Sequence, residues 1–171
     1  MSDWNADHYL KFGDERTRAA VDLVARIDLS SPATITDLGC GPGNSTAILR
    51  QRWPNAKVIG FDNSPGMIAS AREKYPDQTW ETADISEWNP KSPADLVFSN
   101  AALRWIPDHS RLISATKVDG ALAFQIPSGT FAEVRKLIHE IALDPKWNDR
   151  MDPARNALTM EAPGFYYDAL A

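Results

Sequence analysis

A glycine-rich loop and a distant carboxylate give this sequence its clearest chemical signal. Three glycines alternate with a cysteine and a proline over residues 39–43, after a stretch at 34–38 that begins with alternating β-branched and apolar residues and before a helical run from Asn44. A strand that turns through glycines into a helix gathers bare backbone N–H groups and a positive helix end at one point. Asp62 follows 19 residues after Gly43, at the spacing where a carboxylate binds a ribose diol. The pattern indicates a site for a nucleoside-type ligand.

The elements that must position these residues alternate between strands and helices. Apolar and β-branched runs predict strands at 34–38, 57–62, 78–82, 94–100 and 121–126, and apolar periodicity predicts helices at 15–27, 44–53 and 65–75. Asn44 or Ser45 is expected to cap the second helix, and Ser64 the third, with Pro65 in its first turn. The alternation predicts an α/β fold with a Rossmann-like, doubly wound, mostly parallel sheet. Ligands of such sheets bind at the carboxyl ends of the strands, where the strand order reverses.

Composition limits the classes of function. The chain has 171 residues, which is enough for one domain with a core, and its net charge of −5 without a Lys/Arg cluster argues against a nucleic-acid surface. No apolar run approaches the ~20 residues of a membrane span, and no signal peptide is visible. The single cysteine, Cys40, excludes an internal disulfide framework and fits a reducing compartment. We expect a cytoplasmic protein, monomer or weak dimer, with no metal and no nucleic-acid or membrane partner.

The motifs resemble those of the class I S-adenosylmethionine (SAM)-dependent methyltransferases. The loop reads G-x-G-x-G after Asp37-Leu38, whereas the dinucleotide pattern G-x-G-x-x-G would need a glycine where Asn44 stands. Asp62-Asn63-Ser64 and Asp84-Ile85, each at the end of a predicted strand, continue the resemblance. The resemblance implies SAM as the cofactor and S-adenosylhomocysteine as its product.

In that family the glycine loop wraps the amino-acid end of SAM, the acid after the second strand binds the ribose, and the acid after the third accepts a hydrogen bond from the adenine amino group. These roles fall here on the loop, on Asp62 and on Asp84, with Ile85 and Met67 against the adenosine. Solvated carboxylates at Asp62 and Asp84, and core packing of Met67, are the alternatives. The expected cofactor-binding residues are Trp4, Asp37, Gly39, Cys40, Gly41, Asp62, Asn63, Met67, Asp84, Ile85, Asn100 and Ala101.

The flanks look like those of the trans-aconitate 2-methyltransferases, which methylate a carboxylate of a small tricarboxylic acid. The matching stretches are 4–12, 15–18, 100–109 and 165–168. A polyanionic acceptor calls for cationic and hydrogen-bonding groups, and guanidinium forks match carboxylates. The expected substrate-binding residues are His8, Tyr9, Arg16, Arg104 and Trp105, although either arginine could instead form a surface ion pair. Because a carboxylate is ionised at pH 7, an in-line displacement needs no general base, and no catalytic acid or base is assigned.

The chain is expected to divide into three parts. The aromatic rings of the polar N-terminal segment either dock on the domain or cover the ligand as a lid. We expect an N-terminal lid segment and helix at 1–29, a SAM-binding core at 30–130 and an incomplete helical segment at 131–171. The family adds two strands after the fifth, but beyond Ile126 only a helical pattern at 131–143 is visible, so the C-terminal strands are expected to be missing. A fragment, a sequence with segments missing and a naturally short form remain open.

Three functions follow. The first is SAM-dependent methylation of a small carboxylic acid, and the second is a non-catalytic SAM-binding domain or fragment. The third, an NAD-dependent oxidoreductase, is opposed by the glycine spacing and by the lack of a second phosphate-binding half.

Overall fold

Five parallel strands form the centre of the protein. The structure, a computed structural model, describes residues 13–106, 108–126, 136–137, 140–141, 143–147 and 163–170. The strands are β1 (Thr34–Leu38), β2 (Lys57–Asp62), β3 (Thr79–Thr82), β4 (Ala94–Asn100) and β5 (Thr116–Gln125). They pair in the order β3-β2-β1-β4-β5, and each neighbouring pair is parallel. The chain winds outward from β1 to β3 and returns to the other side of β1, which confirms the doubly wound sheet and places the order reversal between β1 and β4.

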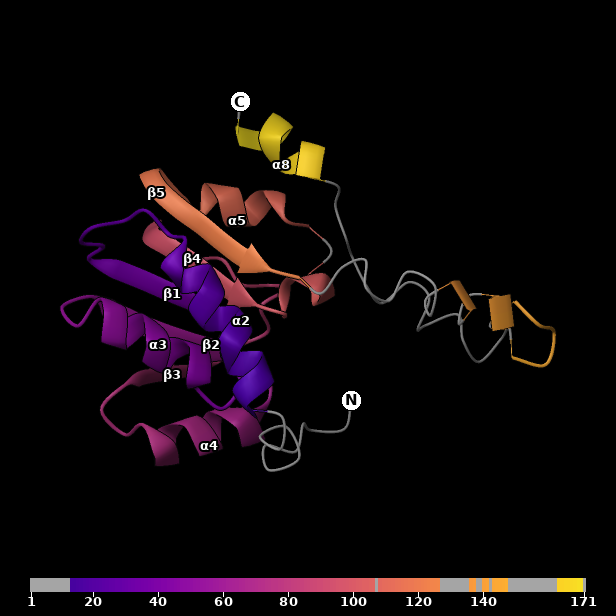
Figure 1. Cartoon of the computed structure of the whole chain (residues 1–171), viewed down its shortest axis with the longest axis horizontal. Coiled ribbons are helices and arrows are strands. Elements are labelled where there is room, and N and C mark those ends of the chain that lie inside the picture. Colours follow the sequence, from indigo (N-terminus) through magenta and orange to yellow (C-terminus); the bar gives the residue numbers. More distant parts are fainter. Residues whose placement is uncertain are drawn as a thin grey trace.

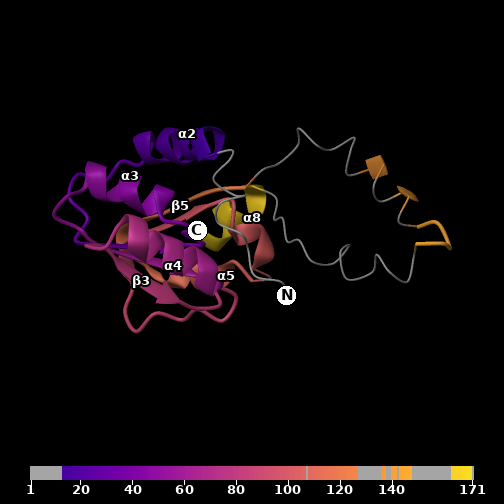
Figure 2. The same ribbon diagram turned by 90° about the horizontal axis from the view of Figure 1, so that it is seen from below.

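Helices cover both faces of this sheet. They are α2 (Gly13–Ala25), α3 (Asn44–Arg52), α4 (Pro65–Lys74), η1 (Leu103–Trp105, one 3-10 turn), α5 (Ser110–Ser114) and α8 (Pro163–Leu170). Figure 2 shows α2 and α3 over one face and α5 on the other side. In Figure 1, α8 lies beside α5 at the β5 edge of the sheet. No described helix is long and apolar enough to cross a membrane.

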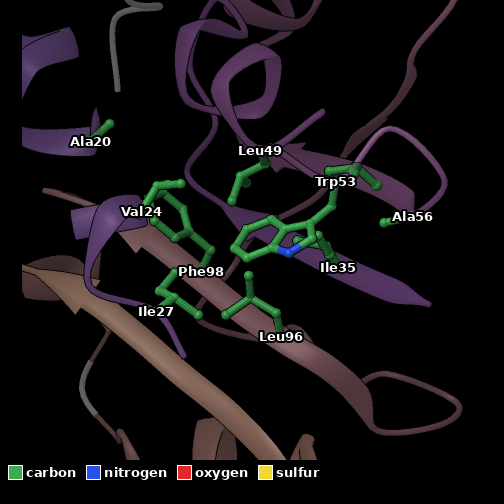
Figure 3. Packing of buried hydrophobic residues seen from close by; sticks show 10 residues of the cluster. Ala20, Val24, Ile27, Ile35, Leu49, Trp53, Ala56, Leu96 and Phe98 are labelled. Atoms are coloured by element: carbon green, nitrogen blue, oxygen red, sulfur yellow. The ribbon is translucent and has the colours of Figure 1, made fainter. Parts of the chain in front are cut away.

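One apolar cluster fastens α2 and α3 to the sheet. Figure 3 shows the indole of Trp53 among side chains of α2, β1 and β4. The neighbouring Arg52 donates hydrogen bonds to the carbonyls of Val24 and Ile27, at the C-terminal end of α2. These bonds satisfy carbonyls that a helix end leaves unpaired. The cluster therefore fixes the end of α2, whose earlier turns reach the glycine loop.

Several element boundaries differ from those expected. Helix α2 begins at Gly13 and ends at Ala25, two residues before the expected range at both ends. Strand β5 begins at Thr116, not at Ala121, and accommodates a register shift against β4 between Ala94 and Leu96. The predicted helix at 131–143 falls largely outside the described residues.

Of the two predicted helix caps, one is confirmed and one is wrong. Ser64 caps α4 as predicted: its Oγ accepts from the N–H of Met67, and Pro65 occupies the first turn. The capping of α3 by Asn44 or Ser45 is wrong, because the N-cap residue is Gly43, in the left-handed region with no side-chain cap. Glycine tolerates this φ of 89° without steric cost. The side chain of Ser45 is thereby left for another partner.

Candidate functional site

The glycine loop is folded back onto the end of β2. The amides of Gly39 and Cys40 both donate to the carbonyl of Phe61, at 2.8 and 2.9 Å. Gly39, Gly41 and Gly43 all have positive φ, which glycine adopts readily and other residues rarely do. The glycines at these positions are therefore required by the backbone itself.

Asp62 is held by the backbone at the point where it would meet a ligand. Its Oδ2 accepts from the N–H of Gly41 and its Oδ1 from the N–H of Ser64, both at 2.9 Å. The residue is half-buried at the tip of β2, with the exposed Asn63 beside it. A carboxylate offers about four acceptor sites, enough for both backbone bonds and a diol.

Asp37 is a fully buried carboxylate beneath the loop. Its Oδ2 accepts from the hydroxyls of Ser45 and Thr46, at 2.7 and 2.6 Å. Within the described part of the chain nothing donates to its Oδ1. Burial raises the pKa of Asp37 from about 3.8 to about 6, although the two hydroxyls oppose this shift. A buried acceptor without a donor is costly, so the site suits a cationic or N–H donor from a ligand.

A pocket opens between α2, the glycine loop and β4. It is lined by Thr17 and Ala20 of α2, by Gly39, Cys40 and Pro42, by Asn44 and Ser45 of α3, and by Asn100 at the end of β4. It lies at the carboxyl ends of β1 and β4, where the strand order reverses. The structure thus brings the expected residues Gly39, Cys40 and Asn100 to one hollow.

The end of β4 is strained and packed against the glycine loop. Ala101 has φ of 64°, unusual for a residue with a side chain, and its N–H donates to the carbonyl of Gln125 at 2.8 Å. A Cβ placed on Gly39 would lie 2.1 Å from the Cβ of Ala102. Strain of this kind is often found at functional sites. The loop after β4 is therefore set directly on the loop after β1.

The residues expected to meet the adenine lie beyond β3. Ile85 is 8% exposed and would lie 3.8 Å from a Cβ on Gly39, so it is close to the glycine loop. Asp84 is exposed, and its Oδ1 accepts from the N–H and the hydroxyl of Ser86. Met67 is buried near the start of α4. Their contacts with adenosine remain predictions.

Arg104 and Trp105 occupy η1, immediately after the strained turn. Trp105 is 51% exposed, and the Arg104 guanidinium lies 5.7 Å from the centre of its ring. The Nε of Arg104 is buried, and no described residue accepts from it. An arginine with an unsatisfied buried donor beside an exposed aromatic ring can bind a carboxylate.

Four expected site residues cannot be placed. Trp4, His8 and Tyr9 lie outside the described residues, and of Arg16 only the helical backbone is described.

Three side chains at the site were not expected from the sequence. Thr17 lines the pocket, Thr46 binds Asp37, and Gln125 pairs in register with Asn100 at the end of β5. Within the described part, the buried Gln125 Oε1 accepts no hydrogen bond. A glutamine among the apolar residues of a predicted strand is the signal that could have identified it.

Cys40 has no sign of reactivity. It is 4% exposed, and burial raises the pKa of its thiol, with the nearby Asp37 and Asp62 adding to the shift. A thiol is a nucleophile only as thiolate, so Cys40 serves as a small buried side chain. No three His, Cys, Asp or Glu side chains in the described ranges gather as metal ligands would.

The site fits the amino-acid and ribose parts of SAM on two observations. The Oδ1 of Asp37 is a buried acceptor without a donor in the described structure. A Cβ on Gly41 would meet no atom within 4 Å, so open space lies over the loop beside Asp62. Asp37 and the loop would hold the amino acid, and Asp62 the ribose.

Comparison with known proteins points the same way. The family described as "Methyltransferase domain" matches residues 35–122. The chain is 43% identical to trans-aconitate 2-methyltransferase of Rhodopseudomonas palustris over 175 residues, which cover 99% of this chain and 68% of that protein.

Two solved structures are similar to this chain. An S-adenosylmethionine-dependent methyltransferase from Mesorhizobium loti is 31% identical, with a TM-score of 0.54, over 60% of this chain and 50% of that one. A chain of the complex between the Haloferax volcanii Trm112 methyltransferase activator and a methyltransferase has a TM-score of 0.72 at 20% identity, over 96% of this chain and 70% of that one. At this identity the second structure supports the fold alone.

Proposed function

The chain belongs to the SAM-dependent methyltransferases related to trans-aconitate 2-methyltransferase, and we propose that it methylates a carboxylate of a small polycarboxylic acid such as trans-aconitate. The carboxylate acceptor is supported above all by the buried Nε of Arg104, for which the described structure provides no acceptor. The position of η1 also supports the proposal, because it begins directly after Ala102, which packs on Gly39 of the loop.

The chain's own residues hold the cofactor. When bound, SAM supplies a methyl group on a sulfonium, which is already a good leaving group. The glycine loop gives room for its amino-acid part, which Asp37 binds from beneath, and Asp62 orients its ribose through a carboxylate fixed by Gly41 and Ser64. Asp84 and Ile85 select adenine. Orientation of this kind can supply several kcal/mol, up to about 7–11 kcal/mol for well-aligned partners.

The acceptor side works by charge and by exclusion of water. Arg104 and Trp105, with Arg16, His8 and Tyr9 from the N-terminal part, hold the acid so that one carboxylate oxygen faces the methyl group. The oxygen is ionised at pH 7, so it attacks without a general base, and no side chain has to move a proton. The proposed lid is the N-terminal part of 1–29, which would close over the SAM-binding core at 30–130 and remove water.

The reaction is tested with a panel of acids. The chain is incubated with methyl-labelled SAM and trans-aconitate, with acids lacking one carboxylate, and with NAD in place of SAM as a control for the oxidoreductase alternative. We expect labelled monomethyl ester with trans-aconitate, less with the dicarboxylic acids, and the same rate with a metal chelator. SAM binding without transfer to any acid would support a non-catalytic SAM-binding domain.

Arg104→Gln provides the matched variant. It removes the charge but keeps a polar side chain, and loss of charge-assisted hydrogen bonds should raise the KM for the acid at least about tenfold. The Kd for SAM should stay within about twofold of wild type. Arg26→Gln, on an exposed residue directly after α2, is the control and should change neither value. An unchanged KM in Arg104→Gln would remove this residue from the acceptor site.

A further inference from the structure

A buried histidine connects the C-terminal helix to the loop that carries Arg104. His109 is 1% exposed, although it precedes α5 in a surface segment. Its Nε2 lies 2.9 Å from the carbonyl of Leu103, and its Nδ1 lies 2.6 Å from the hydroxyl of Tyr166, which is 57 residues further along the chain. Both ring nitrogens are therefore engaged.

The chemistry of the partners assigns the direction of both bonds. A carbonyl can only accept, so Nε2 carries the proton and donates to Leu103. When the ring carries only this one proton, Nδ1 accepts and the hydroxyl of Tyr166 donates to it. The chain of bonds thus runs in one direction, from α8 through His109 to the first residue of η1.

Packing supports this chain of bonds. The rings of His109 and Tyr166 are stacked at 24° with centres 5.9 Å apart, and Phe124 of β5 lies 5.0 Å from the ring of Tyr166. Leu103 itself is completely buried. Its carbonyl accepts a second bond, from the N–H of Ile106 at 2.9 Å, which closes the turn of η1. His109 therefore holds one of the carbonyls that close this turn.

We propose that His109 is a positioning residue for the acceptor acid: it fixes η1, and with it Arg104 and Trp105, and Tyr166 couples this arrangement to the docking of α8. The inference rests on the proposed role of Arg104 in binding the acid. It assigns to α8 a function in acceptor binding, because undocking the helix would remove the hydroxyl that fixes the imidazole.

The test compares three variants of the full chain with wild type and with one control variant. Tyr166→Phe removes only the hydroxyl and keeps the ring, His109→Gln keeps an N–H donor in place of Nε2, and His109→Leu removes both bonds. Tyr167→Phe is the matched control, since that neighbouring ring is 78% exposed. The readouts are the KM and kcat for the acid, and hydrogen exchange at the amides of Trp105 and Ile106, which close η1.

We expect His109→Leu to raise the KM for the acid about five- to tenfold, with a smaller rise for Tyr166→Phe, partial rescue in His109→Gln and no change in Tyr167→Phe. The Kd for SAM should change less than about twofold. A general loss of folding would instead weaken SAM binding as well. Exchange at Trp105 and Ile106 should accelerate in the same order. Equal KM and equal exchange in wild type and His109→Leu would overturn the proposal.

The exchange readout needs no turnover. If wild type methylated no acid, the proposed reaction would fail, while faster exchange at η1 in Tyr166→Phe would still establish the link from α8 to this loop. If exchange were unchanged in both His109→Leu and Tyr166→Phe, the link itself would be refuted.

Discussion

The backbone N–H of Gly41 donates a 2.9 Å hydrogen bond to the Oδ2 of Asp62, so the tip of β2 and the glycine loop after β1 form one unit. The two residues are 21 positions apart and belong to two of the motifs that carry the family resemblance. The bond explains why the motifs occur together: the carboxylate orients the loop, and the loop orients the carboxylate. Changes at either residue should therefore affect both the loop and ligand binding.

Gly39→Ala and Gly41→Ala should separate folding from binding. At Gly39 a Cβ would clash with Ala102 at 2.1 Å, so this variant should unfold at a clearly lower temperature. At Gly41 the Cβ enters open space and the cost is the positive φ alone, roughly 1–2 kcal/mol. Gly41→Ala should fold but bind SAM weakly, because the added alanine methyl group occupies the open space over the glycine loop where SAM is proposed to bind. Thermal melting measures the effect on folding, and calorimetric titration measures the effect on binding. Full SAM affinity in Gly41→Ala would show that SAM does not bind over the glycine loop.

The buried Asp37 should make stability fall with rising pH. Its pKa is raised by burial to about 6, so the folded state binds more protons than the unfolded state between about pH 4 and 6. The contribution of protonated Asp37 to the free energy of unfolding is fully present below pH 3.8 and is lost as pH rises through 6. The loss amounts to at most about 3 kcal/mol. Asp37→Asn should remove this dependence and melt higher than wild type at pH 8 without ligand.

The same variant should bind SAM more weakly, since a neutral amide cannot pair with the ammonium of its amino-acid part. Denaturant unfolding from pH 4 to 8, with and without SAM, provides the measurement. A wild-type stability independent of pH in this window, matched by Asp37→Asn, would contradict the assignment.

Asp95, at the other end of the sheet, should have the opposite effect to Asp37: its contribution to stability is lost as pH falls. Its Oδ2 accepts from the amides of Ala33 and Thr34 and from the Thr34 hydroxyl, and its Oδ1 lies 2.8 Å from the Lys117 ammonium. The bond from Lys117, followed by those from Thr34, lowers the pKa of Asp95 from 3.8 to about 2. Its contribution is present above pH 3.8 and is lost as pH falls through 2.

Asp95→Ala should therefore lower the free energy of unfolding at pH 7 by about 1–3 kcal/mol, because several bonds to one carboxylate are lost. Lys117→Met removes only a partly exposed ion pair and should cost about 0.2–1 kcal/mol. Urea denaturation at neutral pH compares the two. Equal losses would mean that the amides of Ala33 and Thr34 contribute nothing.

The sequence predicts the individual elements better than their contacts. The strand ending at Asp62 and the cap at Ser64 follow from local patterns, and both are confirmed. The start of β5 was missed because Lys117, Val118 and Asp119 are exposed at the sheet edge and lack an apolar pattern. Local rules could not reveal the bond between His109 and Tyr166, because only the packing of α8 brings them together.

The site shows the same division. Spacing was sufficient to bring Gly41 and Asp62 into one prediction, and they are in contact. Spacing did not predict that Ser45 and Thr46 would bind Asp37. The N-cap residue of α3 is Gly43, which has no side chain, so neither hydroxyl is used as a cap and both bind Asp37.

Calorimetric titration of SAM into wild type, Asp62→Asn, Asp62→Ala and the exposed-surface control Asp77→Ala tests the central claim most directly. We predict saturable binding by wild type and by Asp77→Ala, and at least about tenfold weaker binding by both Asp62 variants, because the ribose loses a charged acceptor. Asp62→Asn keeps a carbonyl for the Gly41 amide, so its loss of affinity reports on the ligand. No binding by folded wild type, or equal binding by all four proteins, would contradict a SAM site at the glycine loop.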